Sequence, residues 1–311
     1  MEPILQIEHL SITFTQYSRG ARRRELPVIR DLSLSLSPGE VTAVVGASGS
    51  GKSLLAHAIL GLLPYNSRRK GSILYKGQEL TPRRLEKLRG REISLVPQGV
   101  TYLDPLMKVG PQLTQGRRDI DTRRRAQEAL SRYGLGPGTE RLYPFQLSGG
   151  MARRVLMASA VMESPQLIIA DEPTPGLDAQ AAGRLLGHFR ELAQEGAAVL
   201  FITHDLELAL TVAHRVAVFY AGETIEEALA SDFEAGSLRH PFTKALWDAL
   251  PQRGFRPIPG SQPYPGEVGE GCPFLGQCPH PGAGCAQGPL PLRPFQGGAV
   301  RCLYPNKEVA P

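Results

Sequence analysis

The chain has 311 residues, of which 41% are hydrophobic and 21% charged, and its formal net charge is +5. No apolar run reaches the roughly 18 residues of a membrane span, and Met1 to Gln6 lack the basic and then apolar build of a secretory signal. We therefore expect a cytosolic protein that meets a membrane through partners. The basic residues form short scattered clusters, which favours solvated surface or partner contacts over nucleic-acid binding.

The chain begins with two apolar–polar alternations, over 4–14 and 28–36, which predict half-buried strands around a polar hairpin tip at 16–25. The turn Ser37-Pro38-Gly39-Glu40 leads into the apolar run 41–45, which predicts a buried parallel strand. An antiparallel β piece is therefore expected to join a parallel α/β core.

A glycine-rich segment follows the run 41–45 and precedes a helical stretch at 54–60; it reads Gly46-Ala47-Ser48-Gly49-Ser50-Gly51-Lys52-Ser53. Small residues let the backbone curl so that successive N–H groups point at an anion, and the helix dipole adds to that field. Lys52 is placed to reach the β- and γ-phosphates of a nucleotide, and the Ser53 hydroxyl to bind Mg²⁺. The alternative is a glycine-rich turn with a chance lysine, which the full spacing between strand and helix disfavours.

Residues 61–70 predict a loop, and 71–77 a short strand and turn. A second apolar strand, 93–96, leads to the lone polar residue Gln98. A glutamine at the end of a buried strand can reach a metal ion or the attacking water, and a loop cap is an equally good interpretation.

The chain from about 105 to 162 has helical periodicity without a strand pattern, which predicts a helical subdomain inserted in the core. It contains Gln146-Leu147-Ser148-Gly149-Gly150-Met151 just before a long helix. Ser148, Gly149 and Gly150 there would form an anion-binding helix start, with free N–H groups and a hydroxyl donor. Ser148 is also an ordinary N-cap residue.

Two further apolar strands end in polar side chains. The run 167–170 is followed by Asp171, which can bind Mg²⁺, and by Glu172, which can polarise the water that attacks the γ-phosphate. Asp178 lies near the start of the next helix, and the strand 198–203 ends at His204. Because parallel strands end at one rim of the sheet, His204 is placed to hydrogen-bond the γ-phosphate.

Taken together, these segments resemble the ATPase subunit of an ABC transporter over roughly residues 4–245. The resemblance implies the P-loop NTPase cassette of that family, with an antiparallel β subdomain and a helical insertion. It makes Glu172, His204 and Gln98 catalytic, and Ser53, Gln98 and Asp171 ligands of Mg²⁺. It also assigns Asp178 to the D-loop, which contacts the nucleotide, and Phe14 to stacking on adenine, although a half-buried strand residue fits Phe14 nearly as well.

The resemblance also implies a mechanism. Two cassettes would face each other head to tail, with ATP on the loop 46–53 of one closed over by Ser148-Gly149-Gly150 of the other. The segment that follows Gln98 would pass the motion to a membrane partner. Two positions depart from the family pattern, Arg153, where glutamine is usual, and Pro175-Gly176, where Ser/Thr-Ala is usual. Neither removes a catalytic group.

The composition changes after about 236, and residues 246–311 are rich in proline and glycine. His240-Pro241-Phe242-Thr243 resembles a segment of the peptide and nickel importer branch of ABC ATPases. All four cysteines lie in this extension, at Cys272, Cys278, Cys285 and Cys302. Four thiols in a small segment with little core suggest a metal site. The branch carries a 4Fe–4S cluster in this tail, and a zinc site or unliganded thiols are the alternatives.

The branch further implies import of di- or oligopeptides, nickel or metal chelates at the cytoplasmic face of the bacterial cell membrane. Its partners are two permease subunits, a second and often non-identical ATPase, and an extracytoplasmic solute-binding protein. Two other functions compete with this one, a soluble ABC ATPase that acts on nucleic acid or ribosomes and a non-catalytic ATP-binding subunit. The single cassette argues against the first, and the presence of Glu172 and His204 argues against the second.

Overall fold

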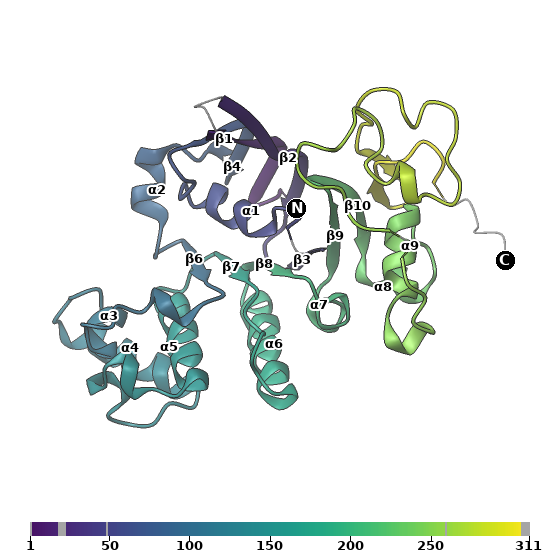
Figure 1. Ribbon diagram of the computed structural model, residues 1–311. Coiled ribbons are helices and arrows are strands. Elements are labelled where there is room, and N and C mark those ends of the chain that lie inside the picture. The colour runs from purple at the N-terminus through teal and green to yellow at the C-terminus, as the bar shows by residue number, and fades with distance from the viewer. Residues whose placement is uncertain (1, 18–22, 48, 259, 306–311) are drawn as a thin grey trace.

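The computed structural model describes residues 2–17, 23–47, 49–258 and 260–305. In this part of the chain a mixed sheet of 12 strands forms the centre of the molecule (Figure 1). Its strands are β1 (Leu5–Tyr17), β2 (Arg23–Leu36), β3 (Val41–Gly46), β4 (Ser67–Tyr75), β5 (Gln78–Glu79), β6 (Ile93–Val96), β7 (Leu167–Asp171), β8 (Ala198–Thr203), β9 (Arg215–Tyr220), β10 (Glu223–Leu229), β11 (Arg293–Phe295) and β12 (Gly298–Val300).

The sheet has a parallel part and an antiparallel part. The main strand order is β5-β4-β1-β2-β10-β9-β3-β8-β7-β6. Strands β9, β3, β8, β7 and β6 are parallel, whereas β1 pairs antiparallel with both β2 and β4. Strand β3 lies between β9 and β8, so the glycine-rich loop after β3 leaves the sheet from an inner strand of the parallel part.

Both faces of the parallel strands are apolar because helices cover both. Along β7, Leu167 and Ile169 pack on the side of α1, and Ile168 and Ala170 pack into a second core on the other side. This alternation divides the interior into two clusters, as expected for a sheet that is buried on both faces.

The helices join this sheet in different ways. They are α1 (Lys52–Ile59), α2 (Pro82–Leu88), α3 (Val109–Leu113), α4 (Ile120–Arg132), α5 (Gly149–Val161), α6 (Ala179–Gln194), α7 (Leu206–Val212), α8 (Ala230–Glu234) and α9 (Pro241–Asp248). Figure 1 shows α3, α4 and α5 as a lobe to one side of the sheet, within the range 105–162 assigned to a helical subdomain. None of the helices in the described ranges combines the length and apolar composition of a membrane span.

The C-terminal extension is attached to the sheet. Its hairpin β11–β12 pairs through β12 with β10, where Val300 lies opposite Glu226. Helix α9 crosses the boundary between 245 and 246 that the sequence analysis draws, and its Phe242 and Trp247 pack on Tyr220 and Phe233. The extension therefore shares a core with the end of the cassette.

One expected loop is a strand. Residues 61–70 have no apolar alternation, yet β4 begins at Ser67, because residues 67–70 pair with 11–14 of β1. Hydrogen bonding to a neighbouring strand extends β4 beyond the part that its own sequence pattern predicts.

Candidate functional site

The glycine-rich loop between β3 and α1 is tightly packed at both ends. A Cβ atom on Gly46 would lie 2.4 Å from the carbonyl oxygen of Phe219, so only glycine fits there without a backbone shift. Gly51, the N-cap of α1, has a φ of 96°, in the left-handed region that glycine adopts freely. Gly49 has a φ of 81°. Ser48, one of the predicted nucleotide-binding residues, lies outside the described residues.

Lys52 lies inside this loop. Its Nζ donates to the carbonyl oxygens of Gly46 at 2.8 Å and Ala47 at 3.0 Å, and the residue is 5% exposed. Burial lowers the pKa of Lys52, and the negative charges of Glu172 and Asp171 work in the opposite direction. Ser50 Oγ is also buried and has no hydrogen-bond partner among the described residues. A buried ammonium and an unpaired buried hydroxyl are donors that suit the phosphates of a nucleotide.

Ser53 and Asp171 form the second part of the site. The Ser53 hydroxyl, in the first turn of α1, donates to Asp171 Oδ1 at 3.1 Å at the end of β7. Burial raises the pKa of Asp171, and the hydrogen bond from Ser53 partly counteracts it. A hydroxyl and a carboxylate at this distance are the oxygen ligands that Mg²⁺ takes in phosphate sites, so the donor set fits that ion.

Glu172 lies beside this pair, between the other two predicted catalytic residues. Gln98 Nε2 donates to one carboxylate oxygen of Glu172 at 3.0 Å, and His204 Nδ1 lies 3.2 Å from the other. The backbone of Glu172 has a φ of 43°, which is unusual for a residue with a side chain. Its N–H donates to Ile202 O at 2.9 Å. The three side chains come from the ends of β6, β7 and β8, and together they fix a carboxylate next to the Ser53–Asp171 pair.

Other predicted residues have ordinary structural contacts. Ser148 caps α5 by accepting from Met151 N at 3.2 Å, and Asp178 caps α6 by accepting from Ala181 N at 2.8 Å. Gly149 and Gly150 are exposed, and a Cβ on either would meet open space. The start of α5 is therefore accessible to another molecule.

Phe14 lies on β1, paired with Leu26 and Ser67. Its side chain is half-buried against the apolar cluster that includes α1. These contacts agree with the second interpretation of Phe14, as a half-buried strand residue.

The four cysteines line one small cavity in the extension. His240 and Phe274 are also part of its wall, and the buried Nε2 atom of His240 has no hydrogen-bond partner in the part of the chain that the structure describes. Burial raises the pKa of Cys272 to about 12, and the other three thiols add to this effect. Within the described ranges, however, no group of three or more His, Cys, Asp or Glu side chains is arranged so that it could hold a metal ion. The expected metal site is therefore not supported by the present positions of the thiols.

Arg153 has a contact that its position in the sequence does not predict. From the sequence alone, Arg153 is only a departure from a family pattern. In the structure its Nη1 donates to the carbonyl oxygen of Pro173 at 2.9 Å, directly after Glu172. Gly176, at the other departure, is close to the same guanidinium. The two unusual positions are thus neighbours in space.

Two family models match the chain. One, described as ABC transporter, covers residues 29–175, and the other, described as Oligopeptide/dipeptide transporter, C-terminal region, covers residues 225–285. The oligopeptide transport ATP-binding protein OppD of Escherichia coli is 34% identical over an alignment of 327 positions, which covers 99% of this chain and 95% of that protein. The dipeptide transport ATP-binding protein DppD of Bacillus subtilis is 36% identical over 301 residues, which cover 90% of this chain and 88% of that protein.

A solved structure supports the fold. An ATP-binding cassette determined as a dimer in a post-hydrolysis state, bound to ADP and Pi, matches with a TM-score of 0.63 and 26% identity. The match covers 73% of this chain and 98% of that cassette. The predicted fold class, an ABC cassette with a mixed α/β sheet, is confirmed. The chain belongs to the ABC transporter ATPases, in the family of oligopeptide and dipeptide transport ATP-binding proteins.

Proposed function

We propose that this chain hydrolyses ATP with Glu172 as the general base, and that hydrolysis drives the uptake of di- or oligopeptides through membrane partners. The observation that carries the proposal is the position of the Glu172 carboxylate. It lies between Gln98 and His204 and beside the Ser53–Asp171 pair, and it interacts electrostatically with the Lys52 ammonium.

Each side chain then has a chemical role. Mg²⁺-bound ATP supplies the phosphoanhydride bond and the cation that neutralises its charge. Lys52 and the N–H groups of the loop 46–53 bind the phosphates, and Ser53 and Asp171 hold the cation. Glu172 orients the attacking water and accepts its proton, while Gln98 and His204 keep the carboxylate in place. We assign Gln98 also to the metal ion and His204 also to the γ-phosphate.

The exposed start of α5 supports a site shared between two cassettes. Ser148, Gly149 and Gly150 are exposed, and among the described residues nothing lies within 4 Å of a Cβ built on either glycine, so the segment is open to a second cassette's nucleotide. The matching dimer bound to ADP and Pi favours the same arrangement. We propose that this segment completes the site of a partner ATPase, with Asp178 and Phe14 as further nucleotide contacts.

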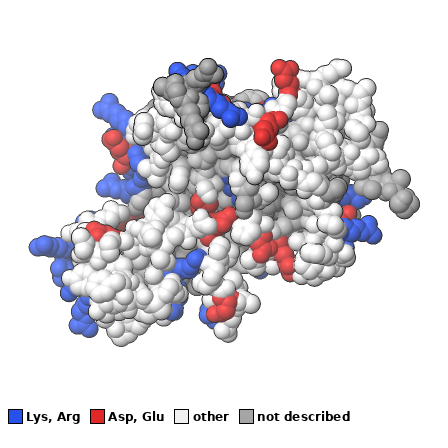
Figure 2. Space-filling model, in the orientation of Figure 1, with Lys and Arg blue, Asp and Glu red and all other residues white. Residues whose placement is uncertain are grey.

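The partners follow from the names of the relatives, which are oligopeptide and dipeptide transport ATP-binding proteins. We propose two permease subunits, a second ABC ATPase and an extracytoplasmic solute-binding protein. The chain would then be a peripheral protein at the cytoplasmic face of a bacterial cell membrane. On the face that Figure 2 shows, Lys and Arg lie in separate groups with Asp and Glu between them, so this face does not favour the alternative of a nucleic-acid partner.

The experiment isolates a tagged chain from detergent-solubilised membranes and identifies the proteins bound to it. We expect two permease subunits, and after reconstitution in liposomes with the binding protein we expect dipeptides or oligopeptides to stimulate ATP hydrolysis. A complex with ribosomes, or a transporter whose ATPase rate ignores every peptide and responds to nickel, would contradict the peptide assignment.

For the extension we propose a 4Fe–4S cluster held by Cys272, Cys278, Cys285 and Cys302. Their common cavity and the soft thiol donor set support it. Anaerobically purified protein should be brown and contain iron and acid-labile sulfide, and Cys285→Ser should lose both. A colourless protein with one zinc ion per chain would favour the zinc alternative, and metal-free protein would reject both.

A further inference from the structure

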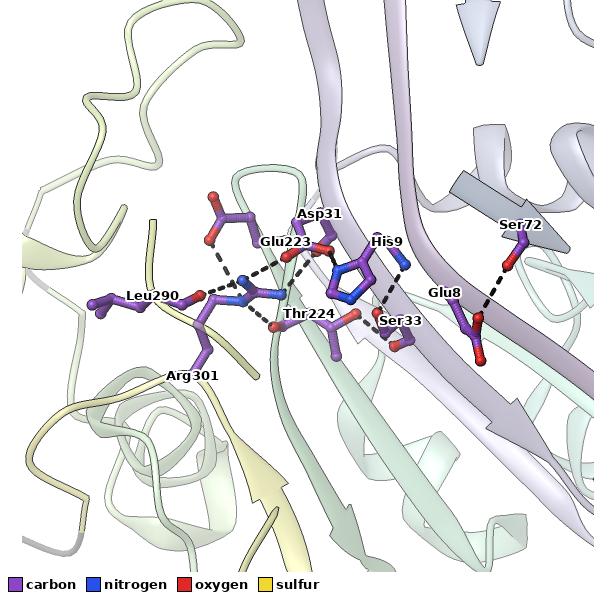
Figure 3. Close-up of polar contacts among 9 residues, drawn as sticks. All are labelled: Glu8, His9, Asp31, Ser33, Ser72, Glu223, Thr224, Leu290 and Arg301. Carbon is purple, nitrogen blue, oxygen red and sulfur yellow. Dashed lines mark hydrogen bonds and ion pairs between the residues drawn. The ribbon is translucent and has the colours of Figure 1, made fainter. Parts of the chain in front are cut away.

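Arg301 is a fully buried arginine in the loop-rich extension, with 2% of its surface exposed. Its Nε donates to Thr224 O at 2.9 Å, its Nη1 to Asp31 Oδ2 at 2.9 Å, and its Nη2 to Asp31 O at 3.2 Å (Figure 3). Nη1 also donates to the carbonyl oxygen of Leu290. The guanidinium therefore fastens the extension to strands β2 and β10 of the cassette.

The residues that Arg301 holds lie where the two parts of the sheet meet. Asp31 and Glu223 form the register pair through which β2 meets β10. Glu223 is 5% exposed and lies between Arg301, at 3.7 Å, and Arg30, at 3.3 Å. Arg30 in turn donates to Gly269 O of the extension at 2.9 Å. Two arginines thus link the cassette to the extension: Arg30 of the cassette bonds to the extension, and Arg301 of the extension bonds to the cassette.

The same stretch of β2 forms one wall of the phosphate loop. A Cβ built on Gly51 would lie 3.0 Å from Ile29 Cγ1 and 3.6 Å from Val28 O. Ile29 is fully buried and lies two residues before Asp31. The Gly222 carbonyl, in the turn before β10, accepts from Arg30 N at 2.8 Å and ties this stretch to the parallel strands. Arg301 is thus hydrogen-bonded to Asp31, and Asp31 lies two residues along β2 from Ile29, whose side chain lies next to Gly51.

We propose that Arg301 is a positioning residue for nucleotide binding, which holds β2 against the phosphate loop from the C-terminal extension. The inference rests on the loop 46–53 as the nucleotide site. If Arg301 is removed, Asp31 loses two hydrogen bonds and keeps its contact with His9, and Arg30 is the one cationic neighbour of Glu223 that is left among the described residues, so β2 is held less tightly at the junction. Because the Ile29 side chain borders Gly51 so closely that a Cβ there would lie 3.0 Å away, such a shift changes the curvature of the loop that must cradle the phosphates.

The test compares the full-length variants Arg301→Gln and Arg293→Gln. Arg293 is an exposed arginine of the same extension whose guanidinium bonds to Cys302 O and Leu303 O, away from β2. We measure the Kd for Mg²⁺ and a fluorescent ATP analogue, together with the melting temperature. Arg301→Gln should raise the Kd about tenfold, as is usual for coupling between two sites. Arg293→Gln should leave the Kd unchanged. Arg301→Lys, which retains the charge, should bind the analogue more tightly than Arg301→Gln does.

A second variant changes Asp31, the cassette residue that Arg301 contacts at this junction. Asp31→Asn keeps the shape of the side chain but removes the charge that Arg301 contacts, and we expect a weaker affinity here too, even if Arg301→Gln fails to fold. If Arg301→Lys and Asp31→Asn lower the melting temperature but bind the analogue as tightly as the unmodified chain, Arg301 serves stability alone and the proposal is wrong. A failure of the nucleotide site itself would look different, because the unmodified chain would then not bind the analogue.

Discussion

His204 Nδ1 lies 3.2 Å from one carboxylate oxygen of Glu172, and Gln98 contacts the other, so both sides of the carboxylate are held. Glu172 directly follows β7, and its backbone φ of 43° lies in the left-handed region. A strained backbone held by surrounding contacts is typical of functional positions.

Glu172→Gln should abolish turnover and leave nucleotide binding intact. The amide retains the shape of the side chain but cannot accept the proton of the attacking water, so we expect the rate to fall by at least about 100-fold. ATP should then accumulate between two cassettes, visible as a dimer by size-exclusion chromatography. Glu128→Gln, at an exposed glutamate of α4, is the control. If Glu172→Gln hydrolysed ATP at the normal rate, Glu172 would not be the general base.

Lys52→Met should weaken nucleotide binding without lowering the stability of the nucleotide-free protein. The ammonium is buried, which lowers its pKa, and a methionine of similar length avoids that desolvation, which offsets the loss of the two hydrogen bonds to Gly46 O and Ala47 O. We expect the Kd for Mg²⁺-ATP to rise roughly 10- to 100-fold, the value of one or two charge-assisted hydrogen bonds. Isothermal titration and thermal melts separate the two effects. Lys87→Met, on the exposed side of α2, should change neither quantity, and a large drop in melting temperature for Lys52→Met would contradict this account.

Gly46→Ala should destabilise the fold, because its Cβ would lie 2.4 Å from a backbone oxygen of Phe219. We expect a loss of about 1–3 kcal/mol in the free energy of unfolding, as for other overpacked sites. Gly136→Ala is the matched control, since its Cβ would meet nothing within 4 Å. In urea unfolding, Gly46→Ala should have a lower midpoint than Gly136→Ala. Equal midpoints would show that β3 and β9 can move apart at this position at little cost in free energy.

The stability of the protein should fall below neutral pH because of His240. Burial, aided by Arg301, lowers the pKa of His240 from 6.5 to about 3. Between these values the unfolded chain binds a proton that the folded chain does not, so the free energy of unfolding falls as the pH falls. The expected slope from this group is about 1.4 kcal/mol per pH unit.

Urea unfolding across that pH interval measures the slope. His240→Asn supplies the comparison, because asparagine can cap α9 as His240 does but does not titrate there. Its unfolding free energy should depend less on pH. Identical slopes for the two proteins would show that other groups cause the acid sensitivity.

The grouping of the candidate site residues could be predicted largely from the sequence, because each of them follows a recognisable local pattern. Loop 46–53 has its full spacing, and Gln98, Glu172 and His204 each follow an apolar run that forms a parallel strand. Parallel strands end at one rim, so the sequence order of these residues implies their proximity. By contrast, Ser148 and Asp178 act as helix caps within this chain, and a role toward a partner cassette needs the partner.

The junction around Arg301 could not be predicted, because its partners are remote in the sequence. Arg301 and Asp31 are 270 positions apart, and nothing near either residue indicates the other. The start of β4 at Ser67 was hidden for the same reason, since the pairing strand β1 imposes it. The sequence signal for a buried Arg301 is its position between Val300 and Cys302. A charged residue flanked by apolar residues often has a buried partner of opposite charge.

The hairpin β11–β12 also has a protective effect. It covers the backbone of Glu226 and Glu227 on β10, which would otherwise present unpaired amide and carbonyl groups to solvent. A cassette truncated before residue 290 would expose this edge and invite strand-to-strand association between copies. Shortened versions of this ATPase should therefore precipitate or form aggregates on concentration, even where their nucleotide loop is intact.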